Sequence, residues 1–199
     1  MRIQKLARGF AWVVRYLTIP PLMALALLTY IQLTVPEYMG GIVVYCLDVL
    51  FLSVFPILAY VLHQLIPYFR RRGREGQRDL AIYMSVAGYV GSVVASLWAK
   101  APFPAMTIAL TYFFSGLLIF VFNKLFRVRA SGHACGVSGP VGAALVLLGC
   151  RVFFILVILL LVYWASLYTK RHTWPQLLWG TAIPWLALAV AYGLAGLLC

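Results

Sequence analysis

The chain has 199 residues, of which 64% are hydrophobic and 10% are charged, and its formal net charge is +12. Soluble domains typically carry about 25% charged residues, so a water-soluble globular protein is excluded. The basic residues stand in short segments between apolar stretches, where they set membrane topology and meet anionic lipid head groups. The sequence therefore predicts a single membrane domain, residues 1–199, whose partner is the lipid bilayer and not a nucleic acid.

Residues 1–17 predict an interfacial amphipathic helix rather than a cleavable signal peptide. Apolar residues recur at helical spacing and leave the basic residues on the other side. Such a helix lies along the membrane surface. The basic residues are Arg2, Lys5, Arg8 and Arg15, and the apolar ones are Ile3, Leu6, Phe10, Trp12, Val13 and Val14.

Seven apolar stretches follow, and crossing the hydrocarbon core takes roughly 20 apolar residues per helix. We expect spans at 19–35, 41–66, 80–98, 106–122, two within 134–166, and 175–198, with the hydrophilic stretch 70–79 as a loop. The stretch 134–166 is too long for one helix, and Gly149-Cys150-Arg151 offers a break. The predicted fold class is all-α: a polytopic transmembrane helix bundle of about six to seven spans plus the N-terminal interfacial helix.

The order of the spans predicts which polar segments share a membrane side, because an even number of spans returns the chain to the same face. The N-terminal segment, the loop 70–79 and the stretches 123–133 and 168–173 then lie together. The opposite side holds Glu37, Lys100 and Arg151 and little else. By the positive-inside rule the basic side is cytoplasmic.

Two polar stretches on this side each carry a histidine beside cations, at the mouth of a span. Arginine and lysine suit phosphate oxygens, and a serine and glycine at a helix start add backbone N–H donors toward an anion. We therefore expect a phosphate site. Its residues are Lys124, Arg127, Arg129, Ser131, Gly132 and His133 in the first stretch, and Lys170, Arg171, His172 and Gln176 in the second.

The two histidines suit phosphoryl transfer at neutral pH, since one can attack phosphorus while the other protonates the departing oxygen. His172 and Gln176 are four residues apart and share a helix face. The Gln176 carbonyl can accept the Nδ1 proton and leave Nε2 of His172 free as nucleophile. The four cysteines, Cys46, Cys135, Cys150 and Cys199, lack the spacing of a metal site, and we expect no metal and no cofactor.

These residues resemble the type 2 phosphatidic acid phosphatases, which are integral membrane histidine phosphatases related to vanadium haloperoxidases. Ala130-Ser131-Gly132-His133 resembles their second motif, Pro-Ser-Gly-His. Their third motif is Ser-Arg, five residues, His, three residues, Asp; anchored on His172, it places Ala165, Ser166 and Gln176 in the other slots. The run from His172 to Gly180 looks like the His-Thr-Pro-x-Gln-Val-x-x-Gly run of a divergent bacterial and archaeal branch.

The resemblance covers residues 123–180 and implies a phosphatase-like core at 123–198, preceded by N-terminal spans at 19–122. It implies that His172 is the nucleophile that forms a phosphohistidine, that His133 is the general acid, and that Ser131 and Gly132 bind phosphate without a metal. The implied protein is a lipid phosphate phosphatase of a prokaryotic cell membrane, acting on a polyprenyl or glycerolipid monophosphate or diphosphate.

The sequence departs from the family at two places. The first motif, Lys, six residues, Arg-Pro, is absent at its spacing, although Lys124, Arg127 and Arg129 are candidates to replace its cations. The arginine slot of the third motif holds Ser166, and loss of such a group can cost several kcal/mol of transition-state stabilisation. Lys170 or Arg171 could compensate.

Two other interpretations stay open at this point. The chain could be a weak or inactive relative that binds or translocates a phosphorylated lipid, or a structural subunit whose histidines are incidental. Arg127, Arg129, Lys170 and Arg171 also fit topology anchors, and His63 fits an interfacial role. Asp48 is an ionisable group inside an apolar span and hence a functional candidate by default, but its position does not place it at the site. The sequence indicates no oligomeric state.

Overall fold

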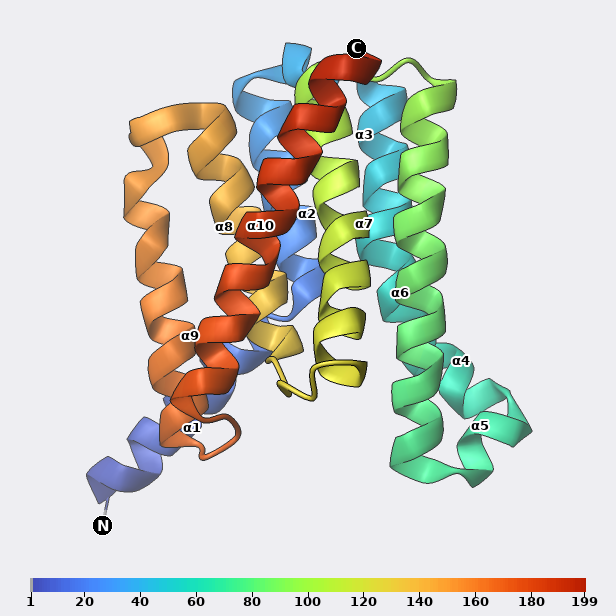
Figure 1. Cartoon of the computed structure of the whole chain (residues 1–199). Coiled ribbons are helices and arrows are strands. Elements are labelled where there is room, and N and C mark those ends of the chain that lie inside the picture. The colour runs from blue at the N-terminus through green and yellow to red at the C-terminus, as the bar shows by residue number, and fades with distance from the viewer. Residues whose placement is uncertain (1) are drawn as a thin grey trace.

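The computed structural model describes residues 2–199, with side chains from Gln4 onward, and this part of the chain is helical without a strand (Figure 1). The all-α fold class is confirmed. Short non-α segments at Pro36–Tyr38, Leu50–Val54 and Gly149–Ile155 connect some of the helices. The helices are α1 (Arg2–Leu17), α2 (Pro20–Thr34), α3 (Ile42–Val49), α4 (Phe55–Leu65), α5 (Pro67–Arg71), α6 (Gly73–Trp98), α7 (Phe103–Lys124), α8 (Gly132–Leu148), α9 (Leu156–Tyr168) and α10 (Trp174–Leu198).

Long apolar helices make this chain an integral membrane protein. By length and composition, five helical segments of the described chain can cross a membrane, and a sixth if α1 and α2, bent by 62°, form one broken span. One of the five is the 37-residue segment Gly132–Tyr168. It turns back on itself at Gly149, whose φ is +73°, and at Val152, whose backbone is not helical. The two predicted spans within it are therefore the arms α8 and α9.

The chain runs from end to end of the bundle and back, as the parity argument predicted. Figure 1 shows α1, α5 and the α7–α8 and α9–α10 connections at the lower end, and the segments near Pro36, Lys100 and Gly149 at the upper end. Both histidine-containing stretches thus lie at one end of the bundle. Which side of the membrane this end faces stays a prediction.

The prediction of a loop at 70–79 is wrong, because most of this stretch is helical: α5 ends at Arg71 and α6 begins at Gly73. Gly73 adopts a φ of +56°, which makes the sharp turn between the two helices. The carboxylate of Glu75, in the first turn of α6, interacts favourably with the positive end of the helix dipole. Arg72, which directly precedes α6, forms an ion pair with Asp79 of α6, with 2.8 Å between Nη2 and Oδ2. These local interactions extend the helix beyond its apolar part.

Packing crosses the predicted division between 19–122 and 123–198. Helix α10 packs against α7 and α8, α2 packs against α8, and α1 packs against α9. Polar side chains join the C-terminal helices: Trp185 Nε1 donates to Ser138 Oγ at 3.1 Å, and the hydroxyls of Tyr163 and Thr181 are 2.7 Å apart. Such contacts and small residues hold helices together in lipid, where the hydrophobic effect between helices is absent.

The α2–α8 contact depends on Gly136, because a Cβ there would lie 2.4 Å from Cβ of Pro20. We predict that Gly136→Ala lowers the unfolding temperature of the purified protein by several degrees, since overpacking typically costs about 1–3 kcal/mol. Gly193→Ala is the matched control: it lies in a helix with nothing within 4 Å of its Cβ. Thermal unfolding in detergent compares them, and equal unfolding temperatures would contradict the close packing.

Candidate functional site

The helix start that carries His172 is built from the run that the sequence singled out. Thr173 caps α10 in a capping box, in which Gln176 Oε1 accepts a hydrogen bond of 3.3 Å from the Thr173 backbone N–H. Nδ1 of His172 lies 3.2 Å from the same oxygen. Because the backbone donor fixes the orientation of the Gln176 amide, Nδ1 must be the nitrogen that carries the proton. Nε2 then holds the free lone pair that a nucleophile needs.

The start of α8 carries His133 and is joined directly to the start of α10. Ser131 caps α8, its hydroxyl accepting from the Ala134 backbone N–H at 3.2 Å, and it is buried. Its own backbone N–H donates to the Gln176 carbonyl at 2.9 Å. A Cβ on Gly180 would lie 2.5 Å from the Ser131 carbonyl oxygen, so only glycine allows this approach. Gly132, in contrast, is exposed at the helix start.

His133 is held from the N-terminal side of the chain. Its Nε2 lies 3.1 Å from Thr18 Oγ1, at the junction of α1 and α2. The Thr18 hydroxyl donates its one proton to the Val14 carbonyl at 2.7 Å, so its oxygen accepts from His133. The proton-bearing nitrogen of His133 is therefore Nε2. To act as the predicted general acid, the ring also has to carry a proton on Nδ1, because only the imidazolium gives up a proton near neutral pH.

The site contains one residue that the sequence did not predict there, Arg15 of α1. Its guanidinium donates to Ser166 Oγ of α9 at 3.2 Å. It also lies within electrostatic range of both His133 and His172. The only signal for this role in the sequence was the position of Arg15, a basic residue within the apolar stretch from Trp12 to Leu17. A topology anchor would give the same signal.

The cations that the sequence did predict lie at the surface. Lys124, Arg127, Arg129 and Lys170 are exposed, and the last three adopt positive φ of +53°, +57° and +53° in tight connections. The α7–α8 connection is closed by Asn123 Oδ1, which accepts from the Ala130 backbone N–H at 2.6 Å. Arg171 is exposed as well, but its guanidinium lies over the Trp12 ring of α1 at 5.2 Å, and its charge acts on His172.

The surroundings of His172 lower its pKa below its ordinary value. Partial burial is the main cause, and the positive charges of Arg15 and Arg171 act in the same direction. The hydrogen bond to Gln176 opposes them. The lowered pKa favours the neutral ring, the state in which Nε2 of His172 can attack an electrophile. No three His, Cys, Asp or Glu side chains of the described residues gather as metal ligands.

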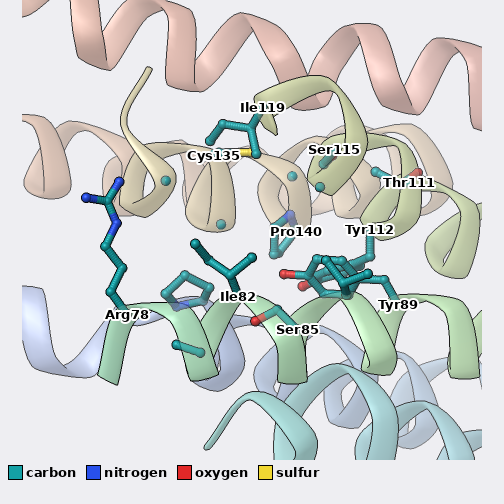
Figure 2. Close-up of a pocket in the computed structure, with 17 residues that line it drawn as sticks. Arg78, Ile82, Ser85, Tyr89, Thr111, Tyr112, Ser115, Ile119, Cys135 and Pro140 are labelled. Atoms are coloured by element: carbon teal, nitrogen blue, oxygen red, sulfur yellow. The ribbon is translucent and has the colours of Figure 1, made fainter. Parts of the chain in front are cut away.

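A cavity of about 300 Å³ lies beside the histidine site, between α6, α7 and α8 (Figure 2). Neither histidine lines it, but their neighbours Gly132 and Pro20 do. Arg78 stands at the end nearest the histidines, and Tyr89 and Tyr112 lie deeper in the bundle. Its walls are mostly apolar, with the hydroxyls of Ser85, Thr111 and Ser115 among them. The cavity has the size and character of pockets that hold small apolar ligands.

Asp48 and His63 lie away from this site. Asp48 is fully buried on α3 and accepts a hydrogen bond of 2.6 Å from Ser92 of α6. His63 is buried near the end of α4, where Nε2 contacts the Gly73 carbonyl oxygen at 3.0 Å. Both therefore have local partners on the side of the bundle opposite α1 and α9 (Figure 1).

Comparison with protein families, with curated proteins and with solved structures finds no match to this chain. The resemblance to the type 2 phosphatidic acid phosphatases therefore stays a prediction from the motifs.

The contact between His172 and Gln176 predicts that two substitutions of Gln176 shift the pKa of His172 in opposite directions. Gln176→Ala removes the hydrogen bond that raises the pKa of His172, so that pKa falls further. Gln176→Glu keeps an acceptor there and adds a negative charge, which favours the imidazolium and raises the pKa. An NMR pH titration of the histidine ring in detergent micelles measures both. A His172 pKa that moves the same way in both variants would contradict the contact.

Proposed function

We propose that the protein is a membrane-embedded, metal-independent lipid phosphate phosphatase that works through a phosphohistidine intermediate. The observation that carries this proposal is the pair of histidines at one bundle end, each with a defined protonation site. His172 presents an unprotonated Nε2 through its bond to Gln176, and His133 holds a proton on Nε2 against Thr18. A nucleophile and an acid in one positively charged site are what phosphoryl transfer requires.

In the first step, Nε2 of His172 attacks phosphorus and the bond from phosphorus to the lipid oxygen breaks. His133, which enters this step as the imidazolium with both ring nitrogens protonated, gives its Nε2 proton to that oxygen, which leaves as an alcohol, or as a lipid monophosphate when the substrate is a diphosphate. His133 is then neutral. In the second step it takes a proton from a water molecule, whose oxygen attacks the phosphohistidine. Inorganic phosphate departs, and both histidines return to their starting states.

The cavity supports a lipid as the substrate. It begins at Gly132, one residue from His133, and runs toward the middle of the bundle between apolar walls. A hydrocarbon chain lying there would leave its phosphate at the helix starts, where Gly132 is exposed. Polyprenyl and glycerolipid phosphates both fit this description. The basic residues at the same end support a cytoplasmic site in this proposal, by the positive-inside rule.

We predict that His172→Ala abolishes phosphate release from a panel of lipid monophosphates and diphosphates, because no other group then attacks phosphorus. Brief incubation of wild type with ³²P-labelled substrate should yield an acid-labile, base-stable label on the protein, and His172→Ala should yield none. His63→Gln is the matched control, since it changes a histidine on another part of the bundle. Release that survives His172→Ala would reject this mechanism.

The role of His133 as general acid predicts a dependence on the leaving group. His133→Ala should slow hydrolysis of an alkyl phosphate by about 100-fold or more. An aryl phosphate such as p-nitrophenyl phosphate departs without a proton, so its first step should lose much less. The test compares the single-turnover rate of phosphohistidine formation for the two substrates. Equal losses would assign His133 a role in binding rather than in acid catalysis.

A second candidate function is a protein that binds or moves a phosphorylated lipid without hydrolysing it. Ser166 favours it, because a hydroxyl fills the slot where the third motif has an arginine. The cavity and the cations would serve this function equally well. Lipid phosphate that binds the purified protein without release of inorganic phosphate would decide for the second function.

A further inference from the structure

This chain lacks the arginine of the third motif, but an arginine of another helix reaches the same place. Ser166 takes the arginine slot on α9, and the guanidinium of Arg15 on α1 reaches the same place, with 3.2 Å between its Nη1 and Ser166 Oγ. We infer that Arg15 is a phosphate-binding residue of this site, in the position that the motif assigns to a residue 151 positions later. This inference rests on the proposed function and adds α1 to the machinery.

The donors of Arg15 are only partly used by the protein. Ser166 takes one N–H, and Nε is buried without a hydrogen-bond partner among the described residues. A buried donor without a partner is destabilising, so such a group in a charged site calls for a ligand. Guanidinium presents its N–H groups in a fork that matches phosphate oxygens. Arg15 therefore has both the charge and the free donor that a phosphoryl group needs.

No acid of the described residues neutralises this region. The four acids of the chain are Glu37, Asp48, Glu75 and Asp79. Glu37 lies near the other end of the bundle, and the remaining three lie on α3 and α6, across the bundle from α1 and α9 (Figure 1). Asp79 pairs with Arg72. Two guanidiniums, Arg15 and Arg171, thus act on His172 without a carboxylate partner, and an anion is the group that would balance them.

The small side chains of α9 make room for this arrangement. Ala165 and Ser166 are fully buried, and Ala165 packs with Ala11 and Val14 of α1. Small residues allow helices to approach closely in lipid. An arginine at position 166 would enter the space that Arg15 occupies, so the serine on α9 and the arginine on α1 fit together as one exchange.

Aromatic packing fixes the direction of Arg15. The Trp12 ring lies 5.9 Å from the Arg15 guanidinium carbon and 5.2 Å from that of Arg171. It therefore contacts both cations at the edge of the site, an arrangement that cation–π attraction stabilises. The next turn of the chain brings Thr18 to His133. One helix end thus positions a guanidinium and the general acid together.

The test measures binding of orthovanadate, a phosphate mimic, to the full chain in detergent at fixed pH and ionic strength. Arg15→Gln should raise the Kd about tenfold to a hundredfold, as for other hydrogen bonds to charged groups. Arg15→Lys, which keeps the charge but not the fork, should fall between. Arg8→Gln is the matched control, because it removes one charge from an exposed position on the same helix. It should bind vanadate like wild type.

Two further readouts separate anion binding from helix docking. Arg15→Gln should raise the pKa of His172, because the charge of Arg15 lowers it. The double variant Arg15→Gln with Ser166→Arg moves a guanidinium to the slot of the motif and should regain part of the vanadate affinity. A structural role would lower affinity and unfolding temperature together, alike in Arg15→Gln and Arg15→Lys, without changing the pKa of His172; that result overturns the inference.

The outcomes also separate this inference from the proposed function. Vanadate binding that depends on Arg15 in a protein that hydrolyses no lipid phosphate would keep Arg15 as a phosphate-binding residue and reject the phosphatase. Hydrolysis that proceeds equally in Arg15→Gln and Arg8→Gln, with equal vanadate affinity, would keep the phosphatase and reject the role of Arg15. A wild type that binds no vanadate overturns the inference as well.

Discussion

The site depends on one backbone hydrogen bond, from Ser131 N–H to the Gln176 carbonyl oxygen at 2.9 Å. It joins the starts of α8 and α10, and Gly180 lets the two backbones approach at the same point. His133 lies two residues after Ser131, at the start of α8. His172 lies next to Thr173, the residue that caps α10. Because this bond and both caps lie at the helix starts, the histidines are placed by helix ends rather than by long loops, which suits a site that has to hold a reacting group in place.

The bend of 62° between α1 and α2 connects the N-terminal segment to this arrangement. A straight continuation of α2 would carry Arg15 and Thr18 along the bundle axis and away from α9. The bend instead lays α1 against α9, so that Thr18 meets His133 and Arg15 meets Ser166. The exposed apolar side chains of α1, among them Leu6 and Val13, face away from the buried Ala11 and Val14, which agrees with contact to lipid on that side.

Hydropathy was sufficient to predict the helices, the turn at Gly149 and the bundle end shared by the two histidines, because each follows from local composition and from parity. It failed at 70–79, where charged residues form a helix through an ion pair and a favourable first turn that hydropathy does not record. The contact between His172 and Gln176 was predictable from four-residue spacing. Arg15 was not, since its partner Ser166 is 151 positions away and nothing in the sequence links them.

The positive charge of Arg15 and Arg171 affects both an anion at the site and the ring of His172. In the proposed function it would attract a phosphate anion, and it lowers the pKa of His172, which favours the neutral ring before a substrate binds. Without Arg15 and Arg171 the imidazole would accept a proton more readily, and a protonated ring is no nucleophile. Once a phosphoryl group binds, its negative charge offsets the same field, and the positive charge on the ring that develops with attack on phosphorus becomes easier to bear. In this proposal Arg15 would therefore serve anion binding and nucleophile activation together, which a cation at the exposed positions of Lys124, Arg127 or Arg129 would not achieve.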